Sequence, residues 1–150
     1  MLQTEQRIAV FPGSFNPFTI GHYSIVERAA GLFDKIYVAI GFNAEKNTDV
    51  AVNHRVESIK NALATFENVE VTSYTGLTVE FCHLVKARYI VRGIRSVADF
   101  EYERNMADLN RRIGNVETIL LYSLPEHGSV SSSVVRELER YGVDVSQFLP

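Results

Sequence analysis

The segment IAVFPGSFNPFTIGH, residues 8–22, has the composition of a strand, a turn and a helix start in succession. Its apolar beginning, Ile8–Phe11, predicts a buried strand, and the Gly- and Pro-rich loop behind it predicts a sharp turn. A helix that begins near Thr19 or Gly21 would point free N–H groups and its positive dipole end at an anion. His22 would then be placed to donate a hydrogen bond to a phosphoryl oxygen. The pattern T-x-G-H alone leaves open an ordinary loop with a solvated histidine.

Beyond this segment, short apolar runs alternate with segments whose apolar residues recur every three or four positions. The runs predict five strands, Ile8–Phe11, Lys35–Ile40, Val69–Ser73, Tyr89–Val91 and Glu117–Tyr122. The periodic segments predict helices with buried stripes, namely Ile25, Val26, Ala29, Ala30 and Phe33, then Val56, Ile59, Leu63 and Phe66, then Tyr102, Met106, Leu109 and Ile113. The alternation predicts an α/β fold, a Rossmann-like, doubly wound, five-stranded parallel sheet in one domain over residues 1–150. Ligands of such folds bind beyond the carboxyl ends of the strands.

Polar residues mark the expected starts of two helices. Asn53 precedes the second periodic segment and Ser96 precedes the third, and both residue types are favoured N-caps. Asp99 follows Ser96 by three positions, which is close to a capping box. We therefore expect helices to begin just after Asn53 and Ser96.

A second polar cluster, RGIRSVADFEYE at residues 92–103, follows the predicted fourth strand. Arg92 and Arg95 bracket a glycine at the mouth of a helix, which suits a bidentate grip on phosphate oxygens. The alternative is a surface pair neutralised by the acidic residues of the same stretch, an arrangement that usually stabilises little. Position favours the phosphate site, because both arginines should face the same rim of the sheet as His22.

A third cluster, HGSVSSSVVR at residues 127–136, follows the fifth strand. Serines at a helix start are often simple caps, but four serines with Arg136 one turn inside also form a dense donor set for a triphosphate. Lys46 lies in the polar loop Gly41–Asn47 after the second strand. A lone loop lysine is normally solvated, and Lys46 becomes a candidate because it leaves the same edge of the sheet.

Composition argues against several classes of protein. The net charge of −3 disfavours a general nucleic-acid or membrane-surface binder, which needs a basic face. The single cysteine, Cys82, cannot form an internal disulfide, and the polar segment Met1–Ile8 lacks the apolar core of a signal peptide, so we expect a cytoplasmic protein. Cys82 and His83 have no partners at metal-ligand spacing and are interpreted as structural. The sequence has no P-loop motif, and no G-x-G-x-x-G motif follows the first strand. A P-loop kinase and an ordinary dinucleotide dehydrogenase are therefore disfavoured.

Together the motifs resemble the nucleotidyltransferase superfamily with the (H/T)-x-G-H signature and, within it, the phosphopantetheine adenylyltransferases. The similarity extends from Ile8 to Pro150 and rests on PGSFNP (12–17), TIGH (19–22), RGIR (92–95), ADFEYE (98–103) and the serine run. T-x-G-H marks the superfamily, whereas R-G-x-R with A-D-F-E-Y-E is specific to the family. The resemblance implies a nucleotidyltransferase-type fold. It also implies transfer of the adenylyl group of ATP to 4′-phosphopantetheine, giving dephospho-coenzyme A and pyrophosphate, with Mg²⁺ delivered with ATP.

The resemblance also assigns roles by position. His22 would stabilise the transition state of an in-line attack without a covalent enzyme intermediate, and Lys46 and Arg92 would hold the acceptor phosphate. The implied acceptor contacts are Ser14, Lys46, Thr78 and Arg92. The implied ATP contacts are Ser14, Phe15, His22, Gly93, Ile94, Arg95, Glu103, His127, Gly128, Ser129, Val130, Ser131, Ser132 and Ser133. We expect Leu77, Thr78 and Phe81 to form one wall of an apolar pocket for the uncharged arm. We also expect no acidic neighbour that fully neutralises Lys46 or Arg92.

The chain departs from the family pattern at several positions. Ser14 and Asn16 stand where threonine and aspartate are usual, and both replacements keep hydrogen-bonding capacity. Thr78 replaces a more apolar residue. His127-Gly128 stands where many members have tryptophan-serine, which alters the adenine side of the expected pocket.

The resemblance implies a homo-oligomer, commonly a hexamer, and makes coenzyme A a candidate feedback ligand. Two rival functions stay open. One is a nucleotidyltransferase acting on nicotinamide mononucleotide or glycerol phosphate. The R-G-x-R stretch disfavours this function. The other is a non-catalytic nucleotide sensor, which would have no need of His22, Lys46, Arg92 and Arg95 together.

Overall fold

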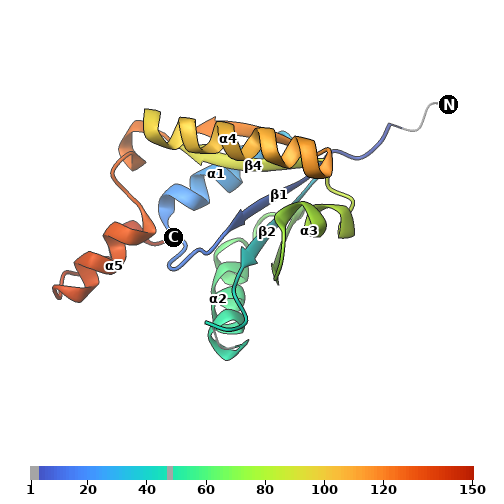
Figure 1. The fold of residues 1–150 in the computed structure, drawn as a ribbon. Helices are drawn as coiled ribbons and strands as arrows, with labels where there is room; N and C mark the ends of the chain where they lie inside the picture. The colour runs from blue at the N-terminus through green and yellow to red at the C-terminus, as the bar shows by residue number, and fades with distance from the viewer. Residues whose placement is uncertain (1–3, 47–48) are drawn as a thin grey trace.

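The computed structural model describes residues 4–46 and 49–150. Its strands are β1 (Ile8–Gly13), β2 (Lys35–Gly41), β3 (Val69–Tyr74), β4 (Tyr89–Ile94) and β5 (Glu117–Tyr122). They form one sheet in the order β3-β2-β1-β4-β5, and every neighbouring pair is parallel (Figure 1). The predicted five-stranded parallel sheet is confirmed. Asn47, and the first three residues of the polar amino-terminal segment, lie outside the described residues.

Helices cover both faces of the sheet. They are α1 (Ile20–Ala30), α2 (Asp49–Ala62), α3 (Thr78–Leu84), α4 (Val97–Gly114) and α5 (Ser132–Arg140), with short 3₁₀ turns η1 (Pro125–His127) and η2 (Ser146–Phe148). α1 and α2 pack on one face, α3 and α4 lie on the other, and α5 extends away from the sheet (Figure 1). Successive side chains of β1 point to opposite faces of the sheet. Ala9 and Phe11 pack with α1 and α2, whereas Val10 packs with α3. The stripes predicted for the first two helices pack in the core, with Ala30 and Phe66 only partly buried. Phe33, Leu63 and Phe66 follow the ends of α1 and α2.

Four strands are longer than predicted, β2 and β3 by one residue each, and β1 and β4 by two and three residues. The predicted first strand ends at Phe11, but β1 continues to Gly13 because its pairing with β2 extends that far. The predicted fourth strand ends at Val91, whereas β4 continues through Arg92 to Ile94, paired along that length with β5. Arg92 is therefore held by a strand and not by the loop that the sequence predicted.

The predicted N-cap Asn53 is wrong, whereas the predicted N-cap Ser96 is confirmed. α2 begins at Asp49, so Asn53 lies one turn inside the helix. Val52 is buried and continues the predicted stripe one turn toward the amino terminus, so apolar contact stabilises a longer helix. Ser96 caps α4, where its hydroxyl accepts a hydrogen bond from the N–H of Asp99.

The stripe predicted for α4 is not part of the core. Tyr102, Met106, Leu109 and Ile113 are 62%, 36%, 50% and 59% exposed. The buried residues of α4 are instead Glu103 and Gly114. Gly114 lies so close to α3 that a Cβ there would come within 2.6 Å of the Val79 Cβ. This contact fixes α4 beside α3 and leaves its apolar stripe facing a groove.

Candidate active site

Two cavities meet at the carboxyl ends of β1 and β4, where the strand order reverses. The His22 cavity, of about 280 Å³, is lined chiefly by Gly13–Phe15, His22, Gly93, Arg95 and Val130–Ser133. The α4 groove, of about 510 Å³, is lined chiefly by Tyr74, Leu77–Val79, Tyr102, Met106, Leu109, Asn110 and Ile113. Pro12, Gly13, Arg92 and Glu103 line both, so the two cavities are continuous around Arg92.

His22 is fixed by the capping box that starts α1. The Thr19 hydroxyl accepts from the His22 N–H, and the Thr19 N–H donates to His22 Nδ1 at 2.9 Å. His22 thus takes the place that Glu or Gln has in the usual capping box. Because a backbone N–H can only donate, Nδ1 is the acceptor and the ring proton lies on Nε2. The Nε2–H group is left for the cavity.

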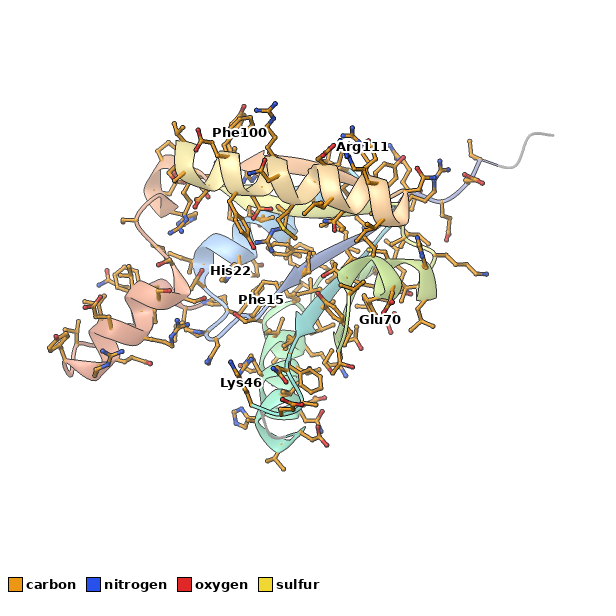
Figure 2. All side chains as sticks on the ribbon, viewed as in Figure 1. Phe15, His22, Lys46, Glu70, Phe100 and Arg111 are labelled. Atoms are coloured by element: carbon orange, nitrogen blue, oxygen red, sulfur yellow. The ribbon has the colours of Figure 1, made fainter. Side chains whose placement is uncertain are left out.

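The imidazole is held neutral. Burial, reinforced by the positive charges of Arg92 and Arg95, lowers the pKa of His22 to about 4. The Phe18 ring stacks on it with 5.4 Å between centroids, and the Phe15 ring meets it edge-on at 5.0 Å. Figure 2 shows Phe15 close to His22. At neutral pH, His22 is therefore an oriented, uncharged hydrogen-bond donor.

The end of β1 and the loop after it are held by arginines from three separate elements. Arg92 of β4 donates to the Pro12 carbonyl at 2.6 Å, Arg55 of α2 to the Ser14 carbonyl at 2.9 Å, and Arg136 of α5 to the Asn16 carbonyl at 2.6 Å. The turn itself depends on Gly13, since a Cβ there would lie 2.9 Å from the Phe15 ring. Phe15 has a φ of 46°, in the left-handed region. The loop is thus a fixed part of the cavity wall.

Arg92 is paired with a buried carboxylate. Its Nε and Nη2 lie 2.9 and 2.8 Å from Oε1 of Glu103, which is only 6% exposed. The expectation that Arg92 has no neutralising neighbour is wrong, because the turn from β4 into α4 brings the two residues together. With Nη1 also donating to the Pro12 carbonyl, one N–H remains on each of Nη1 and Nη2. The pair therefore fixes Arg92 and still leaves donors for a phosphate.

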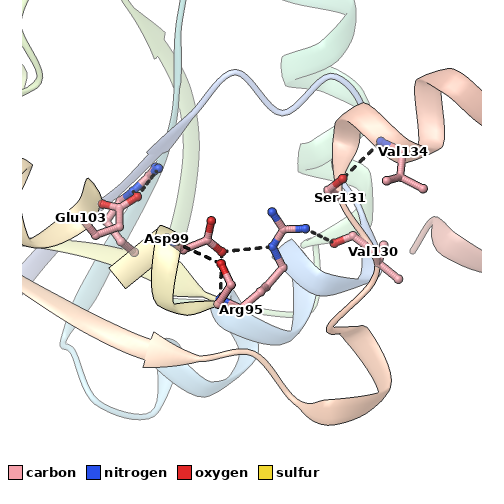
Figure 3. A network of polar contacts seen from close by, with 8 residues as sticks. Arg95, Asp99, Glu103, Val130, Ser131 and Val134 are labelled. Carbon is pink, nitrogen blue, oxygen red and sulfur yellow. Dashed lines mark hydrogen bonds and ion pairs between the residues drawn. The ribbon is translucent and has the colours of Figure 1, made fainter. Parts of the chain in front are cut away.

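Arg95 links the start of α4 to the start of α5 (Figure 3). Its Nε lies 3.5 Å from Asp99 Oδ2, and its Nη1 donates to the Val130 carbonyl at 3.4 Å. The same Asp99 oxygen accepts from the Arg95 backbone N–H at 3.0 Å. Ser131 caps α5 by accepting from the Val134 N–H. The cap and the guanidinium lie on one wall of the His22 cavity.

Most of the predicted ATP contacts line the His22 cavity. Ser14, Phe15, His22, Gly93, Arg95, Glu103, His127, Val130, Ser131, Ser132 and Ser133 do so. Ile94, Gly128 and Ser129 are not among its lining residues, and Ile94 is buried. Arg136 lies outside this lining and holds the loop after β1 instead. The Ser132 hydroxyl donates to the Pro17 carbonyl at 2.7 Å, so the serine run also ties α5 to that loop.

The predicted acceptor contacts are divided between the cavities. Ser14 lines the His22 cavity, Thr78 lines the α4 groove, and Arg92 lines both. Lys46 lines neither cavity. It is exposed in the turn after β2, toward the same end of the sheet as His22 (Figure 2).

Two of the three residues predicted to form a wall of the arm pocket line the α4 groove. Leu77 and Thr78 line the α4 groove, whereas Phe81 is buried behind it. Tyr74 lies on the same side as Thr78, with their hydroxyl oxygens 2.7 Å apart, and the other wall comes from the α4 stripe together with Asn110. The spacing of the stripe was visible in the sequence, but periodicity does not distinguish a core face from a groove face. No sequence signal indicated the contact of Arg55 with the loop after β1.

The structural role expected for Cys82 and His83 is supported. Cys82 is buried, and burial raises the pKa of its thiol to about 12. The His83 Nε2–H group donates a hydrogen bond to the Gly114 carbonyl oxygen at 2.6 Å. In residues 4–46 and 49–150, no three His, Cys, Asp or Glu side chains are grouped to hold a metal ion. Nor does any helix in those ranges have the length and apolar character to cross a bilayer.

Comparison with known proteins assigns the family. A model of the cytidylyltransferase-like proteins matches residues 10–138. The chain is 51% identical to a phosphopantetheine adenylyltransferase of Bacteroides thetaiotaomicron over 144 residues, covering 96% of this chain and 95% of the relative. The chain belongs to the phosphopantetheine adenylyltransferase family. Relatives of the same name from Porphyromonas gingivalis and Oenococcus oeni are 47% and 44% identical, over 97% and 95% of this chain and 95% and 90% of theirs.

Solved structures extend the likeness at the level of the fold. A structure from Vibrio parahaemolyticus, assigned as a nicotinate-nucleotide adenylyltransferase, matches with a TM-score of 0.70 at 18% identity, over 97% of this chain and 87% of that one. A bifunctional NMN adenylyltransferase/ADP ribose pyrophosphatase from Francisella tularensis matches with 0.67 at 16% identity, over 97% and 44%. The predicted nucleotidyltransferase-type fold is confirmed.

Proposed function

We propose that this phosphopantetheine adenylyltransferase family member transfers the adenylyl group of ATP to 4′-phosphopantetheine, giving dephospho-coenzyme A and pyrophosphate. The observation that carries the proposal is the neutral His22, held by Thr19 with its Nε2–H free beside Arg92 and Arg95. A neutral donor in one cavity with two fixed cations suits a phosphoryl group on which negative charge increases during reaction.

The reaction needs positioning more than proton transfer. An oxygen of the acceptor phosphate attacks the α-phosphorus of ATP, the new P–O bond forms, and the bond to the β-phosphate oxygen breaks in line with it. The acceptor is already an anion at neutral pH, so no general base is required. His22 and Arg95 would stabilise the α-phosphoryl group, and Arg92 would present the acceptor phosphate from the boundary of the two cavities. Pyrophosphate leaves as an anion.

The acceptor phosphate would be held by Arg92 with help from Lys46. Arg92 has one donor free on each terminal nitrogen, which matches two phosphate oxygens. Lys46 is exposed at the same end of the sheet and would supply a mobile point charge. The arm would then lie in the α4 groove, which Arg92 also lines and which combines apolar side chains with a few polar ones.

Mg²⁺ would enter as the MgATP complex. The acidic residues that line the His22 cavity, Asp99 and Glu103, are each paired with an arginine. Magnesium favours phosphate oxygens and water as ligands, which ATP supplies. Calorimetry of nucleotide-free protein should detect no tight Mg²⁺ binding, and a tight site would contradict this assignment.

Assembly and regulation follow from the same family proposal. We propose a homo-oligomer, with a hexamer as the specific expectation, in a cytoplasmic location, and feedback binding of coenzyme A. Val97 and Phe100, at the start of α4, are 75% and 44% exposed and lie outside both cavities, as expected of an interface. Light scattering during gel filtration measures the mass directly, and a monomer would contradict the assembly.

The deciding experiment is pyrophosphate release from MgATP with 4′-phosphopantetheine, nicotinamide mononucleotide or glycerol phosphate at matched concentration. We expect turnover with 4′-phosphopantetheine alone, and mass spectrometry should identify dephospho-coenzyme A. Turnover with nicotinamide mononucleotide and none with 4′-phosphopantetheine would leave only the superfamily assignment. ATP binding without turnover of any acceptor would favour the nucleotide sensor.

A further inference from the structure

A pair of hydroxyl groups lies in the otherwise apolar wall of the α4 groove. Tyr74 is the last residue of β3, and Thr78 is the first residue of α3. The Tyr74 Oη and Thr78 Oγ1 atoms are 2.7 Å apart, and both residues line the groove. On this side of the groove the neighbouring side chains, Leu77 and Val79, are apolar, whereas Tyr102, Asn110 and Thr118 supply polar atoms from α4 and β5.

The position of the Tyr74 hydroxyl is fixed from three sides. The Tyr74 ring stacks on Phe81 with 4.8 Å between centroids and an interplanar angle of 19°. Thr78 holds the hydroxyl from one direction. From another direction the backbone of Gly41 packs closely against it, because a Cβ on Gly41 would lie 3.0 Å from the Tyr74 Oη. Gly41 and Thr78 both line the groove, so the hydroxyl between them is placed at the groove wall.

The pair has hydrogen-bonding capacity left over. Each hydroxyl carries one O–H donor and two lone pairs, and the bond between Tyr74 and Thr78 uses one donor and one lone pair. One O–H and several lone pairs stay available. Burial raises the pKa of Tyr74, so its proton is retained at neutral pH. An adjacent donor and acceptor in an apolar wall match the carbonyl and N–H of a secondary amide.

We propose that the Tyr74–Thr78 hydroxyl pair recognises a secondary amide in the arm of the acceptor. Arg92, which lines both cavities, would select the phosphate, and the hydroxyl pair, which lines the groove alone, would select an amide. Together they would favour a long, amide-bearing phosphomonoester over a short or cyclic one. This inference rests on the proposed function and identifies a specificity determinant within it.

The test combines enzyme variants with acceptor analogues. Tyr74→Phe and Thr78→Val remove one hydroxyl each and keep the shape of the side chain. Tyr74→Phe should raise KM for 4′-phosphopantetheine roughly five- to tenfold, with kcat and the KM for ATP changed less than about twofold. Tyr89→Phe is the matched control, because Tyr89 lies at the amino end of β4 and lines neither cavity. Thermal melts of each variant establish that it is folded.

Analogues in which each arm amide in turn is replaced by methylene groups separate recognition from a structural role. If the pair binds an amide, one analogue should lose affinity for the wild type, and Tyr74→Phe should lose nothing further with it. Equal losses with every acceptor would show that the pair only supports α3, and would overturn the inference. So would an unchanged KM in an active, folded Tyr74→Phe. Wild-type protein that does not use 4′-phosphopantetheine would overturn the proposed function and this inference with it.

Discussion

The His22 cavity and the α4 groove adjoin each other and differ in almost every physical property. The cavity is the smaller, about 280 Å³ against 510 Å³, and it is lined by arginines, serines and a neutral histidine. The groove is lined mainly by exposed apolar side chains of α4 and by the start of α3. A polar, fixed cavity suits reaction at a charged centre, whereas an apolar groove suits recognition of an uncharged arm. Chemistry and acceptor selection should therefore be separable by mutation.

The largest effect is expected in the His22 cavity. His22→Ala removes a donor whose hydrogen bond strengthens as charge builds on the α-phosphoryl group, so kcat should fall roughly 10²-fold or more. The Kd for ATP should change far less. Steady-state kinetics and calorimetry test both values, with His54→Ala on the exposed face of α2 as control. Equal losses in ATP binding and turnover would make His22 a ground-state ligand only.

A smaller effect is expected at the boundary between the cavities. Arg92→Ala removes the phosphate fork and leaves the buried Glu103 unpaired, so kcat/KM for the acceptor should fall about 10- to 100-fold. Lys46→Ala should weaken the acceptor less, because Lys46 is exposed and lines neither cavity. ATP binding should stay nearly intact in both. Arg112→Ala removes an exposed charge on α4 and is the control for net charge. If the Kd for ATP rises as much as the KM for the acceptor, the proposed division of roles between the two cavities is wrong.

Changes confined to the groove should act on the acceptor alone. Met106→Ala removes apolar contact from the groove wall and should raise KM for the acceptor about three- to tenfold, with kcat and the KM for ATP unchanged. Leu32→Ala, an exposed apolar residue that lines neither cavity, should change none of these values. A fall in kcat equal to the change in KM would show that the groove also positions the reacting phosphate.

A change of pH between 7 and 8 is expected to have the smallest effect on turnover, whereas a lower pH should reduce the stability of the fold. His22 is neutral in the folded protein down to a pKa of about 4, whereas an unfolded histidine titrates near 6.5. Below pH 6.5 the unfolded state binds the extra proton, so the free energy of unfolding should decrease as pH falls toward 4, by about 3 kcal/mol from this residue. Between pH 7 and 8, titration of His22 should not change kcat. Urea unfolding of wild type, His22→Asn and the control His54→Asn across pH 4–8 tests this, and equal slopes for all three would contradict it.

Much of the site could be predicted because its motifs are local. The strand–turn–helix segment that ends at His22 follows from side-chain period and from the turn residues next to it. The donors gathered at the carboxyl ends of β1 and β4 followed from a general property of parallel sheets. Even the capping interaction between Thr19 and His22 has a sequence signature, a hydroxyl followed three positions later by a polar side chain.

What the sequence by itself determined was the fold class, the family resemblance and the residues of the His22 cavity that lie within contiguous motifs. Only the tertiary structure decided that the α4 stripe lines a groove, because a helical period records one apolar face and not what covers it. Only the tertiary structure paired Arg92 with Glu103 and set Arg55 on the loop after β1. These contacts join elements that are separate in the sequence, and their geometry depends on how the helices pack across the sheet.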